Sequence, residues 1–212
     1  MIKQVQYLEF FDSLLNGDKE ACKRICLTLL ENGESPKSIY LDLFQKSLYR
    51  IGKLWEDGKI NIADEHVATT IIDHLITMIS DKVRKEEDVD NSVIVTCVDK
   101  EFHQIGAKMV ANFFEINGWQ TFYLGANTPA RELVRYIEEK QPDYVGLSIN
   151  FHLNGLRLLE TIDNIRKKFP EQKIIIGGQG ITGIRAEIDK NYPDVVVCES
   201  LEQLEEFISK SR

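Results

Sequence analysis

The stretch VIVTCVDKEFHQIG, residues 93–106, decides the fold of this 212-residue chain. Its first six residues are apolar or β-branched, which is typical of a strand that is buried on both faces. Residues 107–116 continue with apolar positions at helical spacing, so the stretch predicts a strand, a loop and a helix. Glu101 and His103 fall in the loop, at the edge of an open α/β sheet where ligands bind.

The alternation of strand and helix continues to the end of the chain. The predicted strands are 93–98, 121–125, 144–149, 173–178 and 194–198, and the predicted helices are 104–117, 129–140, 153–168, 183–190 and 200–210. Strands that are apolar throughout indicate a parallel sheet covered by helices. The sequence therefore predicts an α/β fold, a five-stranded parallel flavodoxin-like (Rossmann-like) domain over residues 85–212.

The first part of the chain has a helical pattern instead. Apolar residues recur at helical spacing over 5–15, 21–30, 39–55 and 62–83, with short turns between. Asp18 is predicted to cap the second helix, and Ser35 to cap the third with Pro36 at its first position. Short connections favour antiparallel neighbours, so residues 1–84 are predicted to form a four-helix bundle.

A charged, turn-prone segment, KVRKEEDVDNS at 82–92, separates the two patterns and predicts a linker. The run from Glu86 to Asp88 is interpreted as its solvated part. Because Met1 leads almost directly into the first helix, we expect no DNA-binding segment before the bundle.

Composition excludes several functions. A net charge of −8 without a dense basic run argues against a nucleic-acid surface. No apolar stretch approaches the length of a membrane span and no signal peptide is visible, so the sequence predicts a cytoplasmic protein with no membrane contact. The four cysteines are too few and too scattered for a disulfide framework. Cys22 and Cys26, one helical turn apart, are interpreted as packing residues.

Three loops at the carboxyl ends of the predicted strands carry unusual residues: 101–106, 148–150 and 177–180. Glu101 and His103 have the spacing of a metal-binding imidazole whose second ring nitrogen donates to a carboxylate. Whether that contact is direct or through water is left open. Glycines such as Gly177 and Gly178 let the backbone lie against a flat or extended ligand. The GxGxxG fingerprint is missing from the first strand-to-helix turn, and no Walker A sequence occurs.

Together these loops read ExHxxG, SxN and GG, which resembles the cobalamin-binding domain of methionine synthase, base-off mutases and corrinoid proteins. The resemblance implies that His103 is the lower axial ligand of cobalt and that Ser148 and the glycines line a slot for the displaced nucleotide tail. Glu101 and Asn150 depart from the usual Asp and Leu or Thr. The cofactor-binding residues implied here are Glu101, His103, Gly106, Ser148, Asn150, Gly177, Gly178 and Gln179.

The helical part resembles a more particular family. Trp55 is followed after nine residues by Glu65 and His66, as in the Trp-x9-Glu-His motif of CarH-type light-sensing regulators, and residues 123–129, YLGANTP, resemble another of their stretches. The resemblance implies a bundle that caps the upper corrin face, with Trp55 beside the adenosyl group and Glu65 contacting it. The part of His66 in that pocket is left open. Glu56 stands where these regulators can have a histidine.

The sequence thus predicts a stand-alone adenosylcobalamin light sensor that is not itself an enzyme. Loss of the adenosyl group would rearrange the bundle and change how a protein partner is bound. The main alternative is a corrinoid methyl carrier, with methylcobalamin as cofactor and a methyltransferase as partner. A mutase small subunit and a response domain without cobalamin are weaker alternatives. The partner, a regulator or a methyltransferase, and homo-oligomer formation are left open.

Two further histidines receive plainer interpretations. His74 lies on the fourth predicted helix, eight residues after His66, and is interpreted as a surface or packing residue. His152 follows Ser148 closely enough to reach the rim of the pocket, so its contact with the cofactor is left open.

Overall fold

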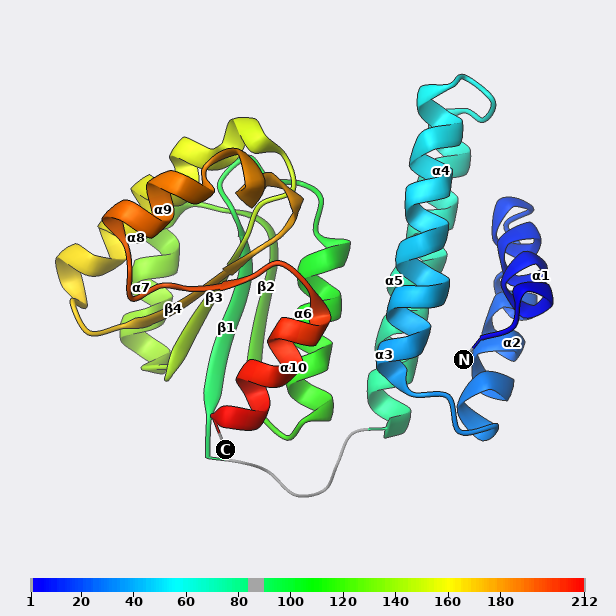
Figure 1. The fold of residues 1–212 in the computed structure, drawn as a ribbon, viewed down its shortest axis with the longest axis horizontal. Helices are drawn as coiled ribbons and strands as arrows, with labels where there is room; N and C mark the ends of the chain where they lie inside the picture. The colour runs from blue at the N-terminus through cyan, green and yellow to red at the C-terminus, as the bar shows by residue number, and fades with distance from the viewer. Residues whose placement is uncertain (1, 84–89, 212) are drawn as a thin grey trace. The chain divides into compact units, whose positions relative to one another are not determined.

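The computed structural model describes residues 2–83 and 90–211. The chain divides into two compact units, Met1–Val83 and Arg84–Arg212, which we call the helical unit and the α/β unit (Figure 1). The boundary predicted between 84 and 85, and the run from Glu86 to Asp88, lie outside the described residues.

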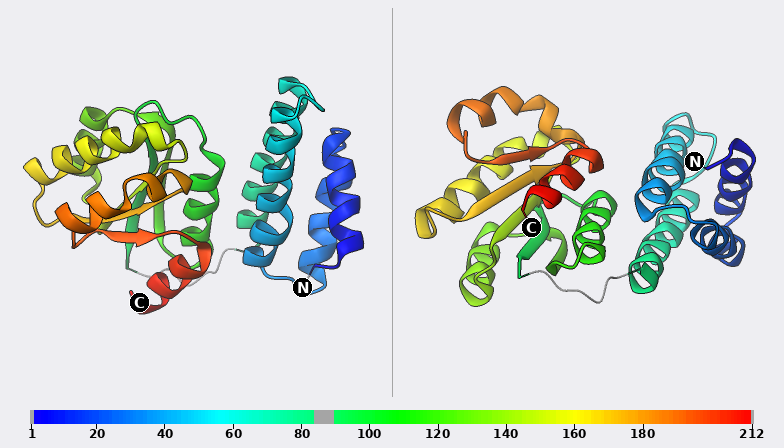
Figure 2. Two further views of the ribbon diagram at one scale, coloured as in Figure 1. Left: turned by 45° about the horizontal axis from the view of Figure 1, so that its top comes forward. Right: turned by 60° about the horizontal axis from the view of Figure 1, so that its bottom comes forward.

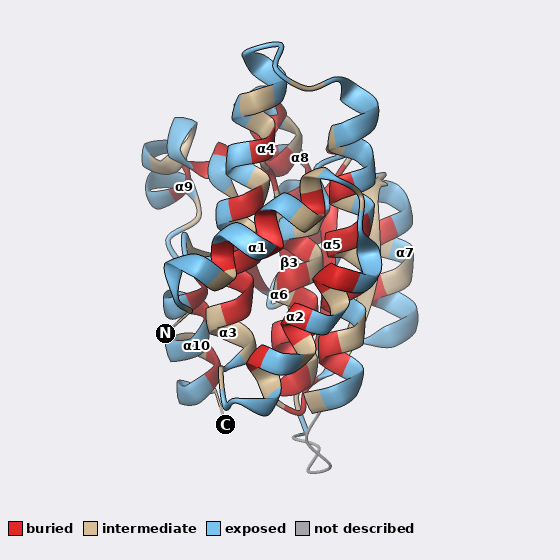
Figure 3. Ribbon diagram, turned by 90° about the vertical axis from the view of Figure 1, so that its right-hand side faces the viewer, coloured by how far each residue is buried: buried red, intermediate tan, exposed pale blue. Residues whose placement is uncertain are grey.

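Residues 2–83 of the helical unit form four long helices and a short one. They are α1 (Gln4–Leu15), α2 (Lys19–Glu31), α3 (Pro36–Ser38), α4 (Lys46–Glu56) and α5 (Ile62–Val83), and a π-helical segment, η1 (Ile39–Gln45), joins α3 to α4. The long helix α5 packs against α1, α2 and α4. Helices α1, α2 and α5 each bury one side and expose the other, as their buried and exposed bands in Figure 3 show.

The predicted caps of the helical unit are confirmed. The Oδ1 atom of Asp18 accepts a hydrogen bond from the backbone N–H of Ala21 at 2.9 Å, and Ser35 Oγ accepts from the N–H of Ser38 at 3.1 Å. The predicted packing role of Cys22 and Cys26 agrees with their complete burial.

One helix prediction needs correction. The predicted third helix begins at Pro36, as its predicted cap indicates, but it is π-helical over Ile39–Gln45, where the apolar spacing predicted a regular helix. Ile39, Tyr40, Leu43 and Phe44 are all fully buried there. Buried positions at i, i+1, i+4 and i+5 also fit one face of an α-helix, so their spacing does not distinguish the π-helical winding.

The described part of the α/β unit, residues 90–211, contains one sheet of five parallel strands. They are β1 (Ser92–Val98), β2 (Gln120–Thr128), β3 (Tyr144–Ser148), β4 (Lys173–Gly177) and β5 (Val196–Cys198), and their order across the sheet is β2-β1-β3-β4-β5. This flavodoxin-like order confirms the predicted fold class. β2 runs three residues past its predicted end because it stays paired with β1 through two register shifts. β5 is two residues shorter than predicted.

Helices cover both faces of the sheet, as Figures 1 and 2 show. One face carries α6 (Ile105–Ile116) and α10 (Leu201–Lys210), and the other carries α7 (Ala130–Lys140), α8 (Gly155–Lys168) and α9 (Arg185–Asn191). Short 3-10 segments, η2 (His152–Asn154) and η3 (Gln179–Gly183), follow β3 and β4. The helix predicted at 183–190 therefore begins later, after η3.

The cores of the two faces differ in character. The α7/α8 face has an aliphatic core that includes Leu147, Leu158 and Ile176. The α6/α10 face has an aromatic cluster in which the Trp119 ring lies 4.8 Å from that of Phe114. No helix within residues 2–83 or 90–211 is both long enough and apolar enough to cross a membrane.

The strand order also positions the functional loops. β1 and β3 are neighbours, and the chain leaves them toward opposite edges of the sheet. In open α/β sheets the crevice at such a switch point, at the carboxyl ends of the strands, is where ligands bind. The loops of His103 and Asn150 lie at this place.

Candidate functional site

Glu101 and His103 are in direct contact at the carboxyl end of β1. The imidazole Nδ1 of His103 lies 2.6 Å from Glu101 Oε1, and the same oxygen accepts the backbone N–H of His103 at 2.9 Å. The Glu101 side chain is fully buried, while that of His103 is 67% exposed. A carboxylate at Nδ1 favours the tautomer that carries its proton there. The ring would therefore bind a metal through Nε2.

The other carboxylate oxygen of Glu101 is held by the segment that follows β3. Glu101 Oε2 accepts hydrogen bonds from the backbone N–H groups of Asn150, at 3.0 Å, and Phe151, at 2.9 Å. It also accepts one from Asn154 Nδ2 at 3.0 Å. Phe151 and Asn154 were missed by the sequence analysis. They are about 50 residues from Glu101, and no local pattern marks such a contact.

These contacts determine the ionisation of Glu101. Burial alone raises the pKa of this carboxyl group, but hydrogen bonds from the His103 side chain, from the backbone of Phe151 and His103, and from Asn154 outweigh burial and lower the pKa to about 2. The carboxylate is thus charged at neutral pH, as a partner of the imidazole N–H must be.

We expect this carboxylate to make the protein sensitive to acid. A lowered folded-state pKa contributes stability that is present above the unfolded-state value of 4.5 and is lost as the pH falls toward about 2. Over that window the wild-type protein should lose about 3 kcal/mol more unfolding free energy than Glu101→Gln. Urea unfolding of the cofactor-free protein between pH 7 and pH 2.5 measures this difference. Glu160→Gln, at an exposed position on α8, is the control, and parallel curves for Glu101→Gln and wild type would contradict the prediction.

Asn150 connects the three loops. Its side-chain Nδ2 donates to the backbone carbonyl of His103 at 3.0 Å, and its Oδ1 accepts the backbone N–H of Gln179 at 3.3 Å. Asn150 was predicted to contact the cofactor. In the structure its amide links the loop at 101–106, which carries His103, to the glycine loop at 177–180. A Leu at this position could not do so, because its side chain has no hydrogen-bonding group.

Ser148 and Gly177 are paired in the sheet, between Cys97 on one side and Cys198 on the other. Their neighbours Leu147 and Ile176 belong to the α7/α8 core. Side chains alternate along a strand, so Ser148 and Gly177 face the α6/α10 side. With Gly146 two residues earlier, this side presents small side chains near the carboxyl edge.

The predicted glycines differ in the contacts that a Cβ would make at their positions. Gly178 has φ +99°, and a Cβ there would lie 2.1 Å from the backbone O of Ile149. A Cβ at Gly177 would lie 2.9 Å from the backbone O of Cys198. At Gly106, on the first turn of α6, a Cβ would meet nothing within 4 Å. Protein packing therefore explains Gly177 and Gly178 but gives no reason for Gly106.

The remaining predicted residues lie in the helical unit, at the end of the α4–α5 hairpin where α4 ends and α5 begins. Trp55 is 46% exposed. Glu65 accepts a hydrogen bond from Thr69 Oγ1 at 2.8 Å, and its other oxygen is 3.6 Å from His66 Nε2. An exposed indole and a carboxylate thus lie on neighbouring turns of the hairpin.

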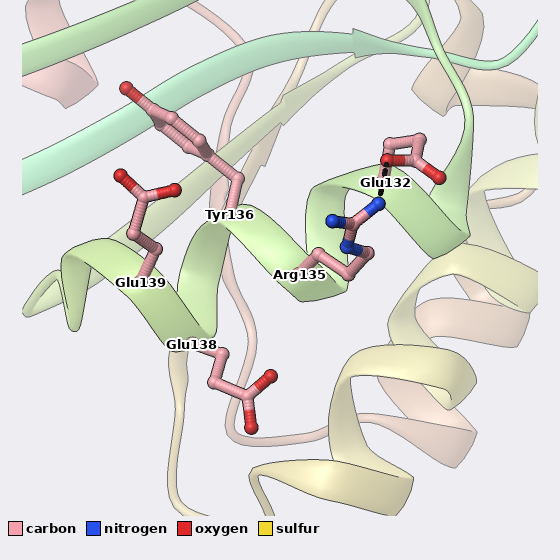
Figure 4. Close-up of a pocket in the computed structure, with 5 residues that line it drawn as sticks. All are labelled: Glu132, Arg135, Tyr136, Glu138 and Glu139. Carbon is pink, nitrogen blue, oxygen red and sulfur yellow. Dashed lines mark hydrogen bonds and ion pairs between the residues drawn. The ribbon is translucent and has the colours of Figure 1, made fainter.

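A depression on α7 is lined by none of the predicted site residues (Figure 4). It is lined by Glu132, Arg135, Tyr136, Glu138 and Glu139. Each of its carboxylates is paired with a cation, so it is an exposed ion-pair surface. The pairs are Glu132 with Arg135 at 3.2 Å, Glu138 with Lys168 at 2.6 Å and Glu139 with Lys140 at 2.7 Å.

Two family models match the chain. The model of the B12 binding domain matches residues 91–208, and a second B12 binding domain model matches residues 8–80. The chain belongs to the B12-binding family. It is a cobalamin-binding protein with an N-terminal helical part, and the small residues on the α6/α10 side, the unexplained Gly106 and the exposed His103 fit that cofactor.

The chain is similar to a corrinoid protein and to a transcriptional repressor. Trimethylamine corrinoid protein 1 of Methanosarcina mazei is 19% identical over 81% of this chain and 82% of that protein. The HTH-type transcriptional repressor CarH of Myxococcus xanthus is 23% identical over 64% of this chain and 44% of that protein.

Solved structures share the fold. The monomethylamine corrinoid protein of Methanosarcina barkeri matches with a TM-score of 0.81 at 14% identity, covering 99% of this chain and 100% of that one. A chain of the methanol:cobalamin methyltransferase complex MtaBC of the same organism matches with a TM-score of 0.51 at 14% identity, covering 98% of this chain and 81% of that one.

Proposed function

We propose that this protein is a corrinoid methyl carrier that holds cobalamin through His103 and presents it to a partner methyltransferase. The observation that carries the proposal is the extent of the match. The trimethylamine corrinoid protein aligns over 82% of its own length, with both units of this chain included, whereas CarH aligns over 44%. The likeness to a chain of a methyltransferase complex supports a methyltransferase as the partner.

In this proposal the residues of the α/β unit hold the cofactor. Cobalamin, when bound, would accept a methyl group and donate it. His103 would bind the cobalt through Nε2, and Glu101 would keep the ring in the right tautomer and orientation. Ser148, Gly177 and Gly178 would line the slot for the nucleotide tail, and Gly106 would leave space beside it.

The light-sensing regulator is a second candidate, and it is favoured by one specific observation. Trp55 exposes nearly half of its surface, and the Glu65 carboxylate is held in place by Thr69. An aromatic face and a fixed hydrogen-bond acceptor suit an adenosyl group, whereas a carrier needs neither. This chain has Glu56 at the position where such regulators can have a histidine.

Affinity for two forms of the cofactor separates the candidates. A carrier should bind methylcobalamin and adenosylcobalamin with dissociation constants within about 10-fold of each other. In a sensor, the double variant Trp55→Ala/Glu65→Gln loses an aromatic contact and a hydrogen bond to the adenosyl group. That loss is about 2–3 kcal/mol, or roughly 30- to 150-fold in adenosylcobalamin affinity. For the carrier we expect no such change. Titration in the dark, followed by absorption, measures both quantities.

Tyr49→Ala/Asp81→Asn is the matched control, because it removes an exposed aromatic ring from α4 and an exposed carboxylate from α5, away from position 56. A selective loss of adenosylcobalamin in the Trp55/Glu65 variant, together with a change of oligomeric state after green illumination, would favour the sensor over the carrier.

A further inference from the structure

The segment YLGANTP, residues 123–129, contacts the loop between β1 and α6, residues 99–104, which we call the histidine loop. The segment forms the last part of β2 and the turn into α7. β2 pairs with β1 through two register shifts near the carboxyl ends of both strands. Irregular pairing of this kind is common beside binding sites, where it redirects side chains. We therefore looked for a role of this segment at the histidine loop.

Asn127 holds the start of the histidine loop by two hydrogen bonds. Its side-chain Oδ1 accepts the backbone N–H of Lys100 at 2.9 Å, and its own backbone N–H donates to the carbonyl of Glu101 at 2.9 Å. Both Asn127 and Lys100 have a positive φ, 55° and 61°. Residues other than glycine seldom adopt this conformation, and surrounding contacts must hold it. The two bonds between Asn127 and the loop are such contacts.

Tyr123 holds the other end of the same loop. Its hydroxyl donates to the backbone carbonyl of Gln104 at 3.1 Å, so His103 lies between two points of attachment to β2. The β2 side therefore fixes the main chain of the loop, whereas the segment after β3 holds the side chain of Glu101. The position of the imidazole Nε2 depends on both, because a side chain moves with the backbone that carries it.

We propose that Asn127 and Tyr123 are positioning residues for the axial ligand, which hold the main chain of the histidine loop in its binding geometry before cofactor is bound. The inference rests on the assignment of His103 as the cobalt ligand in the proposed function. A site whose ligand is already in place loses less conformational entropy on binding. Removing the hydrogen bond from Lys100 to Asn127 should therefore weaken cobalamin binding about 3- to 10-fold.

Three variants isolate the side chain of Asn127. Asn127→Gly removes the acceptor and leaves a positive φ accessible. Asn127→Asp keeps an acceptor oxygen and tolerates a positive φ, so it should behave like wild type. Gln141→Gly is the matched control, because Gln141 is exposed and has φ 47° at the other end of α7. It replaces another left-handed residue by glycine without touching the histidine loop.

Two measurements test the proposal. In the cofactor-free protein, amide hydrogen exchange at Lys100 should be about 3- to 10-fold faster in Asn127→Gly than in wild type. In protein loaded with the paramagnetic Co(II) form of cobalamin, electron paramagnetic resonance shows a threefold nitrogen splitting when a histidine is bound. We expect Asn127→Gly to bind this cobalamin more weakly and to show the splitting in a smaller fraction of molecules. Asn127→Asp and Gln141→Gly should match wild type in both measurements.

A folded Asn127→Gly protein with wild-type affinity and the full splitting overturns the proposal, even if Lys100 exchanges faster, because the contact would then serve stability alone. If Asn127→Gly does not fold, Tyr123→Phe takes its place, since it releases the Gln104 carbonyl and keeps the ring. If wild type and His103→Ala both lack the splitting, the proposed function fails instead. Exchange at Lys100 in the cofactor-free variants then still decides whether Asn127 holds the loop.

Discussion

Replacing His103 by alanine is expected to abolish the histidine-ligated absorption spectrum of the cobalamin-loaded protein. The imidazole is 67% exposed and is oriented by a fully buried carboxylate, and residues 99–104 contain no second histidine. Loss of a partner of a metal-binding histidine costs about 10- to 100-fold in affinity, and loss of the histidine itself should cost at least as much. Titration of wild type and His103→Ala with cobalamin, followed by absorption, measures both effects.

The stability of the cofactor-free variant must be measured beside its affinity. His103→Ala removes a hydrogen bond to a charged group, which is worth about 1.5–3 kcal/mol. His74→Ala, which changes an exposed histidine on α5, should bind cobalamin like wild type. If His103→Ala is folded and keeps the wild-type spectrum, His103 is not the cobalt ligand.

Replacing Gly178 by alanine is expected to destabilise the α/β unit by about 3 kcal/mol or more. At φ +99° and ψ 160° the backbone occupies a region that essentially only glycine adopts, which costs about 1–3 kcal/mol for alanine. The new Cβ would also lie 2.1 Å from the backbone oxygen of Ile149, so the chain must shift. That shift would disturb the bond from Gly180 N–H to the same oxygen. Urea unfolding of the cofactor-free protein measures the loss.

Gly106→Ala is the matched control for Gly178→Ala and should behave in the opposite way. Alanine is favoured over glycine inside a helix by about 0.5–1 kcal/mol, and its Cβ would meet nothing within 4 Å. The variant should therefore unfold at the same or a higher urea concentration, yet bind cobalamin less tightly if the cofactor lies beside this turn. If Gly178→Ala and wild type unfold at the same urea concentration, the backbone at position 178 does not require glycine.

The predictions that succeeded depend on residues close together in the chain. The N-caps Asp18 and Ser35 each bond a residue three positions later, and the Glu101–His103 pair is separated by two. The alternation of apolar strands and amphipathic helices predicted the parallel sheet. The π-helical stretch at 39–45 was missed because its apolar spacing also fits an α-helix, and the limits of β2 and β5 depend on pairing with neighbouring strands.

The sequence alone determined the elements, the family and the local pair of a carboxylate with its histidine, since short spacings in a chain fix short distances in space. Only the tertiary structure decided what holds that pair. The strand order places the segment after β3 beside the loop after β1, so Asn150, Phe151 and Asn154 reach Glu101 from about 50 residues away. Buried carboxylates require donors, but many backbone and amide groups in the chain can supply them. Which ones do so depends on the topology of the sheet, because no spacing along the chain encodes it.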